Sequence, residues 1–365
     1  MRVLFFHAGR EWSGEARVFA VAGRALMSRG YQVTYACRAE SLVEQRVTDE
    51  GLEAVPMDLD GPWLAQAHRL KQVLLDYFVE VVYVHDEREQ LIASAAVRLA
   101  ERGAVVRRTP AGGRLVTSRG ARLAMRLAAT GFVFTSTGEL QSAVLPTKRA
   151  LEPVVAELGV DVARYDAVRA ASPQSLGSVG PGHVVVCVYE PSARVRVATV
   201  LRTVAMLAPR HPDLRLVIVG RGADHEYLRM HAAALGITNA VKLLGERDDQ
   251  LSVLRAADIG WIAADCDDAA YGALDFMALR VPVVAERGTV VQRYVADGIT
   301  GLLLPPGDVP ATAATVAAFL AHDEERAAMG NAGHVRVARD FTERRMVDGF
   351  EHAVGSARDR TRWIV

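Results

Sequence analysis

The chain has 365 residues, of which 50% are hydrophobic, 6% aromatic and 24% charged, and its 43 basic residues balance its 43 acidic ones. A chain of this length can form two domains, each with a hydrophobic core of its own. The neutral balance is typical of an ordinary globular protein, and it argues against a nucleic-acid partner, which would need a basic surface.

The cysteines and the apolar runs indicate where the protein works. Cys37, Cys187 and Cys266 are scattered without metal-ligand spacing, which is typical of buried thiols in a reducing compartment. Residues 1–7 are too few for the core of a signal peptide, and we interpret them as a first buried strand. No apolar run approaches the length of a membrane span. We therefore expect a cytoplasmic protein.

Strand-like apolar runs alternate with helical patterns in the first half of the chain. This rhythm predicts a parallel sheet with helices on both faces. The expected strands are 2–7, 32–36, 81–84, 104–107 and 131–135, and the expected helices are 16–28, 64–78 and 89–101. The loop after the first strand contains Ser13 and Gly14 and can approach a phosphate or a sugar closely. It matches neither a Walker A motif nor Gly-x-Gly-x-x-Gly, so dinucleotide binding is not supported.

Basic residues dominate the segment 98–149. It contains ten arginines and lysines but only two acids, Glu101 and Glu139. Such a face could hold an anionic acceptor, such as a lipid phosphate, or contact a membrane surface peripherally. The alternative is a solvated helix face with no ligand.

A second series of strands and helices begins after residue 180. We expect strands at 184–188, 214–219, 240–244, 259–263, 281–285 and 301–304, with helices at 196–208, 224–235 and 248–256. A small, polar, glycine- and proline-rich stretch precedes this series. We therefore predict an N-terminal domain over 1–170, a linker over 171–182, a C-terminal domain over 183–341 and a terminal amphipathic helix within 342–365.

Two such domains are doubly wound α/β units of the Rossmann type, and ligands bind such folds at the carboxyl ends of the strands. We expect the two carboxyl edges to face a shared cleft.

Two acids in the second domain, Asp267 and Asp275, stand eight positions apart with Gly272 between them. We place Asp275 at the start of a helix, beside free backbone N–H groups, where a ligand with hydroxyls and phosphate charge would fit. The alternative is an N-capping aspartate and a solvated loop acid. Asp265 and Asp267 also spell an Asp-x-Asp metal motif, but no third ligand supports it, and we expect no metal.

These motifs resemble those of the family-4 retaining glycosyltransferases, which have the GT-B fold. The resemblance covers nearly the whole chain and is strongest over 214–341. It implies that Asp267 contacts the donor sugar and Asp275 the nucleotide ribose. Both are aspartates where the family has glutamates, and Arg280 replaces the family's glycine before Pro282.

The resemblance also implies a donor site for the diphosphate and the base. The family's arginine at the end of the first strand of this domain is Tyr189 here, and its lysine is Arg194. Arg194 would stabilise the leaving group, and Arg221 is the candidate to replace the charge missing at Tyr189. Leu244 and Gly245 would contact the base through their backbone. The N–H groups of Gly272, Ala273 and Leu274 would face the departing charge.

On the acceptor side, the family often has a catalytic histidine near the end of a middle strand. The matching segment 105–113 contains none. His85, Asp86 and Arg108 are candidate acceptor contacts, together with Ser13 and Gly14 of the first loop. A structural histidine lining the cleft is the alternative for His85. The family's terminal helix returns to the first domain, and 342–365 could do the same.

The resemblance thus implies a metal-independent, retaining glycosyltransferase that uses a nucleoside-diphosphate sugar and needs no cofactor. Its acceptor would be a hydroxyl of a glycan, a lipid-linked sugar or a small molecule. Tyr189, the absent histidine and Arg293, which stands at a glutamate position of the family, favour an alternative. In that alternative the chain binds a nucleotide or glycan without transferring the sugar. A GT-B epimerase or phosphorylase is a third interpretation, although no cofactor-lysine motif of the phosphorylases is evident.

Overall fold

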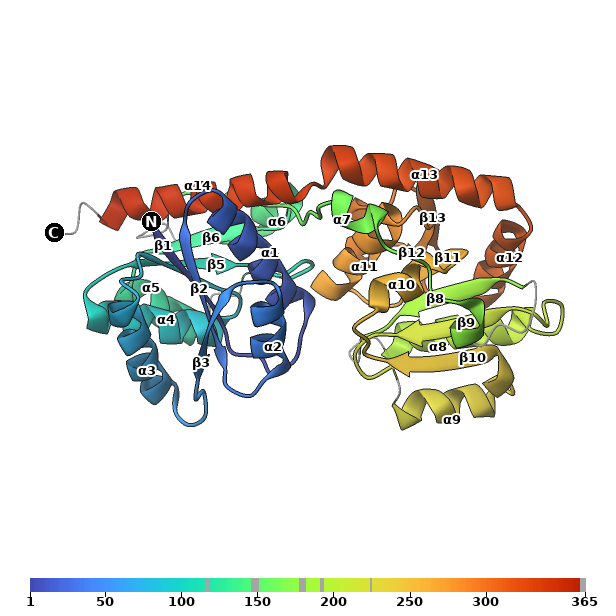
Figure 1. Ribbon diagram of the computed structural model, residues 1–365, viewed down its shortest axis with the longest axis horizontal. Helices are drawn as coiled ribbons and strands as arrows, with labels where there is room; N and C mark the ends of the chain where they lie inside the picture. The colour runs from blue at the N-terminus through green and yellow to red at the C-terminus, as the bar shows by residue number, and fades with distance from the viewer. Residues whose placement is uncertain are drawn as a thin grey trace. The chain divides into compact units, whose positions relative to one another are not determined.

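The structure, a computed structural model, describes residues 1–113, 115, 118–145, 151–176, 182–190, 194–223 and 225–361. Contacts divide the chain into two compact units. Unit 1 comprises Met1–Gly159 and Glu343–Val365, and unit 2 comprises Val160–Thr342. Each unit is built on one parallel sheet (Figure 1), so the predicted α/β class with two doubly wound sheets is confirmed.

The chain passes into unit 2 at Val160, earlier than the predicted linker 171–182. The backbone N–H of Val160 donates to the carbonyl of Phe341 at 3.0 Å, which ties the entry and exit segments of unit 2 together. Ala171 is also bound within unit 2, since its N–H donates to the carbonyl of Ser252 at 2.8 Å. Residues 177–181 of the predicted linker lie outside the described residues.

The unit 1 sheet has seven strands in the order β3-β2-β1-β4-β5-β6-β7. The strands are β1 Arg2–His7, β2 Gln32–Arg38, β3 Glu53–Met57, β4 Val81–Val84, β5 Ala104–Arg108, β6 Thr130–Phe134 and β7 Val154–Val155. The order reverses between β1 and β4, and doubly wound sheets bind ligands at the carboxyl side of such a point. His7 ends β1 and His85 follows β4, so both histidines lie at this switch point.

Helices cover both faces of this sheet (Figure 1). They are α1 Gly14–Ser28, α2 Leu42–Asp49, α3 Trp63–Asp76, α4 Glu87–Ala100, α5 Arg119–Leu127, α6 Thr137–Ser142 and α14 Glu343–Thr361. Helices α3, α4 and α5 pack side by side, whereas α1 packs against α14. Alternate residues of β1 serve the two faces: Phe6 packs with the α3 and α4 core, and Phe5 packs against aromatic rings of α1 and α14.

Helix α14 is held in unit 1 by a buried ring and by charges. Phe350 is fully buried, and its carbonyl accepts a hydrogen bond from the Tyr83 hydroxyl at 2.5 Å. Arg29, the C-cap of α1, pairs with Asp348 at 2.7 Å and with Glu351 at 2.5 Å. The amphipathic pattern of 342–354 therefore corresponds to a helix that completes the unit 1 core.

The unit 2 sheet has six strands in the order β10-β9-β8-β11-β12-β13, and its switch point lies between β8 and β11. The strands are β8 Val184–Val188, β9 Arg215–Val219, β10 Val241–Gly245, β11 Ile259–Ile262, β12 Val283–Glu286 and β13 Gly301–Leu304. The helices are α7 Ala163–Asp166, η1 Pro173–Leu176, α8 Arg194–Leu207, α9 Glu226–Ala234, η3 Thr238–Ala240, α10 Gln250–Arg255, α11 Asp267–Ala278, η4 Val290–Arg293, α12 Val309–Leu320 and α13 Asp323–Asp340.

Helix α11 lies unusually close to the sheet. A Cβ atom at Gly260 of β11 would come within 2.4 Å of the Phe276 ring of α11. A Cβ at Gly272 of α11 would come within 3.0 Å of Ile262. These two glycines therefore allow the helix that carries Asp267 and Asp275 to pack directly on β11.

Arg280, where the family has glycine, adopts a left-handed conformation with φ +62° just after α11. This conformation costs a residue with a Cβ atom roughly 1–2 kcal/mol. Glycine avoids this cost, but its greater conformational entropy in the unfolded chain offsets about 0.5–1 kcal/mol of that stabilisation. We expect Arg280→Gly to raise the free energy of unfolding by roughly 0.5–1 kcal/mol in urea titrations. Arg280→Ala is the control, because it removes the same side chain and keeps the strain. Equal destabilisation by both variants would contradict this account.

Candidate functional site

Tyr189 and Arg194 lie together at the carboxyl edge of unit 2. Tyr189 directly follows β8 and is buried, and Arg194 is the exposed first residue of α8. Burial raises the pKa of Tyr189, while the charge of Arg194 and its hydrogen bond to this side chain oppose the rise. The Arg194 guanidinium also lies over the ring of Tyr227, 5.3 Å from its centroid. The predicted partners of a diphosphate are therefore neighbours.

Arg221 approaches the same strand end from β9. Its guanidinium pairs with Glu190 at 3.1 Å, and Glu190 is the residue after Tyr189. Gly220, at φ +119°, makes this approach possible, since a Cβ there would lie 2.5 Å from the Tyr189 carbonyl oxygen. Arg221, which we expected to replace the charge missing at Tyr189, therefore lies beside Tyr189. The Glu190 carboxylate neutralises part of the Arg221 charge.

Asp267 is the first residue of α11 and is 1% exposed. Backbone N–H groups in the first turn of a helix have no acceptor within the helix, and they carry the positive end of its dipole. The helix-start N–H groups that we expected beside Asp275 therefore lie next to Asp267, and those of Asp268 and Ala269 hydrogen-bond to the Cys266 thiol. The acid at the helix N-terminus is the first of the pair.

The predicted position of Asp275 at a helix start is wrong, because α11 begins eight residues earlier. Asp275 lies inside the helix, is 1% exposed and accepts a hydrogen bond from the Tyr165 hydroxyl at 2.6 Å. Tyr165 belongs to α7, next to the point where the chain enters unit 2. This carboxylate therefore has a buried protein partner.

The predicted role of the N–H groups of Gly272, Ala273 and Leu274 is wrong for the same reason. All three residues are buried in the interior of α11. In a regular helix, an N–H at these positions donates to the carbonyl four residues earlier and is not available to a ligand. Only the first turn of α11 has N–H groups without a carbonyl partner inside the helix, and there those of Asp268 and Ala269 hydrogen-bond to the Cys266 thiol.

Leu244 and Gly245 lie at the end of β10, as the sequence predicts. Leu244 is half-buried, and Gly245 has φ +69°. The Gly245 carbonyl accepts a hydrogen bond from the N–H of Gly220 at 3.0 Å, which joins the ends of β9 and β10. The two positions thus adjoin the Arg221 loop.

The sequence did not predict an ion-pair network at the carboxyl edge of the unit 2 sheet. Arg196 of α8 contacts Asp265, which follows β11, and Glu286, which ends β12, at 3.2 Å each. Asp265 also accepts the N–H of Val290 at 2.7 Å. Arg196 thereby links α8 to the ends of β11 and β12, and a basic residue two positions after Arg194 was its only sequence signal. Within the described chain, no three His, Cys, Asp or Glu side chains are grouped to hold a metal ion.

In unit 1, His85 is a core residue and does not face solvent. It is 1% exposed, its Nε2 donates to the Glu15 carbonyl at 2.7 Å, and its ring stacks on Phe19 with centroids 3.6 Å apart. Burial, followed by the charge of Arg108, lowers its pKa well below the ordinary value. The imidazole is therefore neutral, and its proposed contact with an acceptor is not available on this surface.

Glu89 and His7, neither of which was predicted as a site residue, hold the unit 1 switch point together. Glu89 is 2% exposed and accepts backbone N–H groups from Ala8 at 2.7 Å and from His85 at 2.9 Å. It also forms a capping box with Asp86, the exposed N-cap of α4. His7 lies 3.4 Å from the Glu89 carboxylate. The spacing Asp86-x-x-Glu89 was a readable signal for this cap.

The His7–Glu89 pair predicts a pH dependence of stability. Burial alone would lower the pKa of His7, but the hydrogen bond and charge of Glu89 outweigh it and raise the pKa above 6.5. Burial would raise the pKa of Glu89, but the interactions with His7 and the backbone N–H groups of Ala8 and His85 together outweigh it and lower the pKa. Protonated His7 therefore stabilises the fold below about pH 6.5, and this contribution is lost as the pH rises through its folded pKa.

We expect His7→Gln to lower the free energy of unfolding most between about pH 5 and pH 6.5, where both partners are charged. The difference from the parent protein should shrink at higher pH, because His7 is then neutral in both states. Urea titrations at several pH values measure it. A difference that grows with pH would contradict the assignment.

The other acceptor-side candidates have structural roles. Arg108 is fully buried at the end of β5, and Arg107 donates to the His85 carbonyl at 3.3 Å and to Gln90 at 3.0 Å. Ser13 is the N-cap of α1, where its hydroxyl accepts the N–H of Ala16 at 3.3 Å, and Gly14 is the buried first residue of that helix. These residues shape the switch-point loops, and none of them presents a side chain as a free catalyst.

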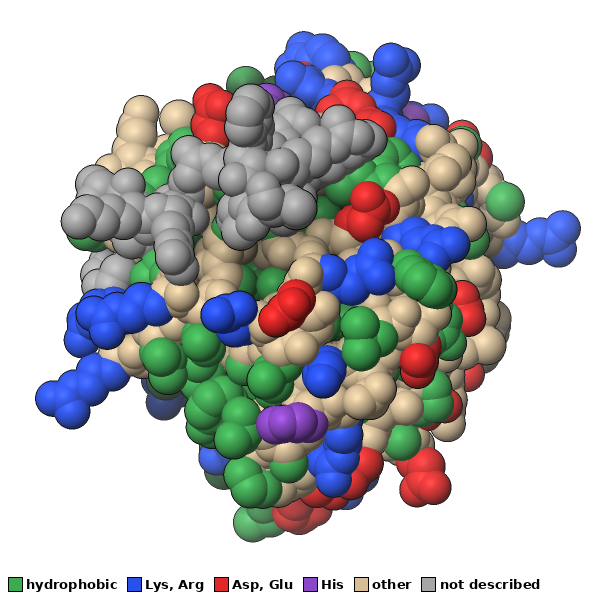
Figure 2. Space-filling view, turned by 90° about the vertical axis from the view of Figure 1, so that its left-hand side faces the viewer, with side chains coloured by type: hydrophobic (Ala, Val, Ile, Leu, Met, Phe, Trp, Pro, Cys, Tyr) green, Lys and Arg blue, Asp and Glu red, His purple; other side chains and the backbone are tan. Residues whose placement is uncertain are grey.

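The basic segment is only partly described, since Arg114, Lys148 and Arg149 lie outside the described residues. Helix α5 exposes Arg119, Arg122 and Arg126 together with Leu123. Figure 2 shows Lys and Arg side chains interspersed with hydrophobic ones on the side of unit 1 that it views. No helix in the described part of the chain is long and apolar enough to cross a membrane.

The donor-side residues all fall within one recognisable segment. Residues 168–336 match the family model described as Glycosyl transferases group 1. This segment runs from the end of α7 through most of α13, so the glycosyl transferases group 1 match contains Tyr189, Arg194, Arg221, Asp267 and Asp275.

Curated relatives match parts of the chain. A phosphatidyl-myo-inositol mannosyltransferase of Mycobacterium leprae is 35% identical over 131 residues, which are 35% of this chain and 34% of that protein. A D-inositol 3-phosphate glycosyltransferase of Salinispora arenicola is 29% identical over 221 residues, which are 56% of this chain and 49% of that protein. The chain spans less than half of the length of these curated relatives.

Among solved structures, Anabaena HepE in complex with UDP-glucose has a TM-score of 0.78 and 17% sequence identity, and the match covers 98% of this chain and all of that one. A glycosyltransferase of Rickettsia africae has a TM-score of 0.78 at 14% identity and covers 97% of this chain. At this level of identity the likeness concerns the fold. The fold of the chain is GT-B.

Proposed function

We propose that the chain is a glycosyltransferase that moves a sugar from a nucleoside-diphosphate donor to an acceptor hydroxyl. The observation that carries the proposal is the convergence of Tyr189, Arg194 and Arg221 beside the β8–β11 switch point, within a segment matching glycosyl transferases group 1. Asp267 adds a buried carboxylate at the N-terminus of α11. The UDP-glucose bound to HepE, which has the same fold, supports a donor of this class.

The proposed reaction is retaining and needs no metal. The acceptor hydroxyl attacks the face of the sugar from which the diphosphate departs, and the leaving phosphate takes the hydroxyl proton. Arg194 and the first turn of α11 stabilise the departing negative charge. Asp267 orients the sugar through its hydroxyls. Because Asp275 is bonded to Tyr165, its proposed contact with the ribose requires that this hydrogen bond be shared or broken.

The donor role of Asp267 can be tested by substitution. We expect Asp267→Asn to lower kcat/KM for transfer by about 100-fold or more, equivalent to roughly 2.7 kcal/mol of transition-state stabilisation. Glu324→Gln, an exposed acid at the start of α13 in the same unit, is the control and should leave kcat/KM unchanged. Equal kcat/KM for Asp267→Asn and the parent would remove Asp267 from the site.

The overall proposal is tested by titrating nucleotide sugars calorimetrically and then measuring donor hydrolysis and transfer. Nuclear magnetic resonance of the product should show the anomeric configuration of the donor, and EDTA should not change the rate. Failure of every nucleotide sugar to bind would refute the donor site. An inverted product would refute the retaining mechanism alone.

A second candidate function is binding without transfer. Two contacts favour it: Glu190 shares the charge of Arg221, and Tyr165 occupies an oxygen of Asp275. Both withdraw groups that a donor would need. Tight nucleotide-sugar binding with no turnover across varied acceptors would favour this candidate over the enzyme.

We propose an acceptor that is a glycan, a lipid-linked sugar or a small molecule, with inositol phosphates and phosphatidylinositol as the first compounds to assay because relatives carry those names. Peripheral contact with an anionic membrane through the 98–149 segment fits the exposed Arg119, Arg122 and Leu123 of α5. Sedimentation with anionic vesicles, compared with neutral ones, tests this contact.

A further inference from the structure

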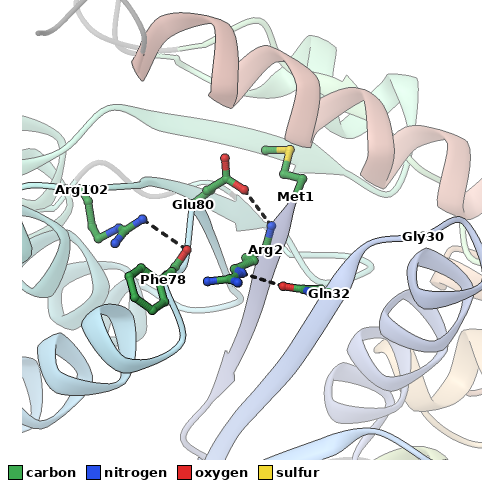
Figure 3. A pocket seen from close by; sticks show the side chains of 7 residues that line it. All are labelled: Met1, Arg2, Gly30, Gln32, Phe78, Glu80 and Arg102. Carbon is green, nitrogen blue, oxygen red and sulfur yellow. Dashed lines mark hydrogen bonds between the residues drawn. The ribbon is translucent and has the colours of Figure 1, made fainter.

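A cavity of about 440 Å³ opens at the amino edge of the unit 1 sheet, opposite the strand ends that the proposed activity uses. Figure 3 shows its walls, which come from the starts of β1 and β2 and from the turns that follow α3 and α4. The lining residues are Met1, Arg2, Gly30, Gln32, Phe78, Glu80 and Arg102. Ligand binding here would be separate from glycosyl transfer.

Two guanidinium groups converge in this cavity over one aromatic ring. The Cζ atom of Arg2 lies 4.9 Å from the centroid of the Phe78 ring, and that of Arg102 lies 5.4 Å from it. In Figure 3 both side chains point toward Phe78 from opposite sides of the cavity. Both positive charges therefore lie beside the same aromatic ring.

Most of the hydrogen-bond donors of these two guanidiniums are unused. Arg2 donates Nε to Gln32 at 2.6 Å, and Arg102 donates one terminal nitrogen to the Phe78 carbonyl at 3.4 Å. The Nε of Arg102 is buried without a partner. Among the described residues, no carboxylate pairs with either guanidinium. Glu80 instead uses its carboxylate to accept the backbone N–H of Arg2 at 2.8 Å.

Phe78 has a backbone conformation and an exposure that are unfavourable for an aromatic residue. It follows the C-cap of α3 with φ +52°, where glycine is the usual residue, and it is 54% exposed. An exposed aromatic ring in a strained conformation gains little from folding. Its contribution is the apolar platform between Arg2 and Arg102.

From these contacts we infer that the Arg2–Phe78–Arg102 cavity binds a phosphate group whose organic part lies against Phe78. Paired guanidiniums with free N–H groups match the oxygens of a phosphate. A second cavity shares Arg2, Gln32 and Phe78 but adds the acids Glu53 and Asp76, whereas the first cavity has both Arg2 and Arg102, so an anion is favoured in the first. The phosphate belongs either to a soluble phosphomonoester or to a lipid headgroup.

Calorimetric titration of the whole chain with inorganic phosphate and with sn-glycerol 3-phosphate tests the soluble source. Sedimentation with phosphatidylcholine vesicles, with and without phosphatidic acid, tests the lipid source. We expect Arg102→Gln and Arg2→Gln each to weaken binding about tenfold or more. Arg88→Gln is the matched control, because Arg88 is exposed at the opposite end of α4, and it should bind like the parent.

Phe78→Asn separates the ring from the charges, since asparagine tolerates the left-handed conformation. It should weaken binding of glycerol phosphate or of vesicles while sparing inorganic phosphate. If Arg2→Gln does not fold, as judged by circular dichroism, Arg102→Gln decides alone. The inference is overturned if the parent binds neither phosphate nor vesicles, or if Arg88→Gln weakens binding as much as Arg102→Gln.

Discussion

Replacement of Glu89 by alanine is expected to lower the free energy of unfolding of unit 1 by about 3–5 kcal/mol. The carboxylate is 2% exposed and accepts N–H groups from Ala8, His85 and Asp86, the last at 3.4 Å. Its loss leaves these donors without their partner and leaves the protonated His7 without its counter-charge. The loops after β1 and β4 would then separate, and the unit 1 switch point would lose its shape.

Urea denaturation followed by circular dichroism measures this effect, and hydrogen exchange at Ala8 and His85 locates it. Arg88→Ala, an exposed neighbour in the same turn of α4, should change stability by no more than about 0.5 kcal/mol. Glu89→Gln should fall between the two, because an amide oxygen can accept some of the same hydrogen bonds. A loss below about 1 kcal/mol for Glu89→Ala would show that water replaces the carboxylate.

The second large effect is expected from Phe350→Ala in α14, at about 3–5 kcal/mol. The ring is fully buried, with its centroid 5.2 Å from that of Tyr83 and 6.3 Å from that of Phe5. Truncation leaves a cavity at the seam between α14 and the sheet. The helix would detach in part, and the tyrosine hydroxyl that donates to its backbone would lose a fixed acceptor.

His352→Ala is the matched control for this variant, since His352 is exposed on the same helix. It should leave the unfolding transition unchanged. Hydrogen exchange should show faster exchange in β4, β5 and β6, which α14 contacts, and unchanged exchange in the unit 2 strands. Equal destabilisation of both units by Phe350→Ala would contradict a role confined to unit 1.

Much of the fold was predictable because each core strand is a short apolar run bounded by turn residues. The predicted strands 2–7 and 184–188 have the bounds of β1 and β8. Strand β3, Glu53–Met57, was missed because it is a short edge strand that contains a proline and buries only Met57. Helix α2 was missed for a similar reason, since only Val43 and Val47 of it are buried.

The predicted start of α11 was wrong because the prediction did not compare the spacing of the two acids with the helical repeat. Asp267 and Asp275 lie two turns apart on one helix, and both are buried against the sheet through Gly260 and Gly272. Periodicity alone does not reveal this close approach, which depends on glycines in two different elements. The Tyr165–Asp275 hydrogen bond spans two distant segments and has no local sequence signal.

The sequence shows which residues depart from the family pattern, but it does not show which contacts those residues make. Tyr189 and Arg221 were identified, whereas the pairing of Arg221 with Glu190 depends on how β8 and β9 align. Likewise, nothing in the sequence indicates that Arg196 of α8 pairs with Asp265 and Glu286, which lie at the ends of β11 and β12. Polar networks between strand ends require the tertiary structure.

Unit 1 joins both ends of the described chain, with all of unit 2 inserted between Gly159 and Glu343. During translation, residues 1–159 therefore emerge before unit 2. Helix α14, which completes their core, is made only after unit 2, a delay on the order of ten seconds or more. Unit 2 is contiguous and can finish folding meanwhile. The nascent first unit exposes the seam that Phe350 later fills, so the first unit synthesised is the last to be completed.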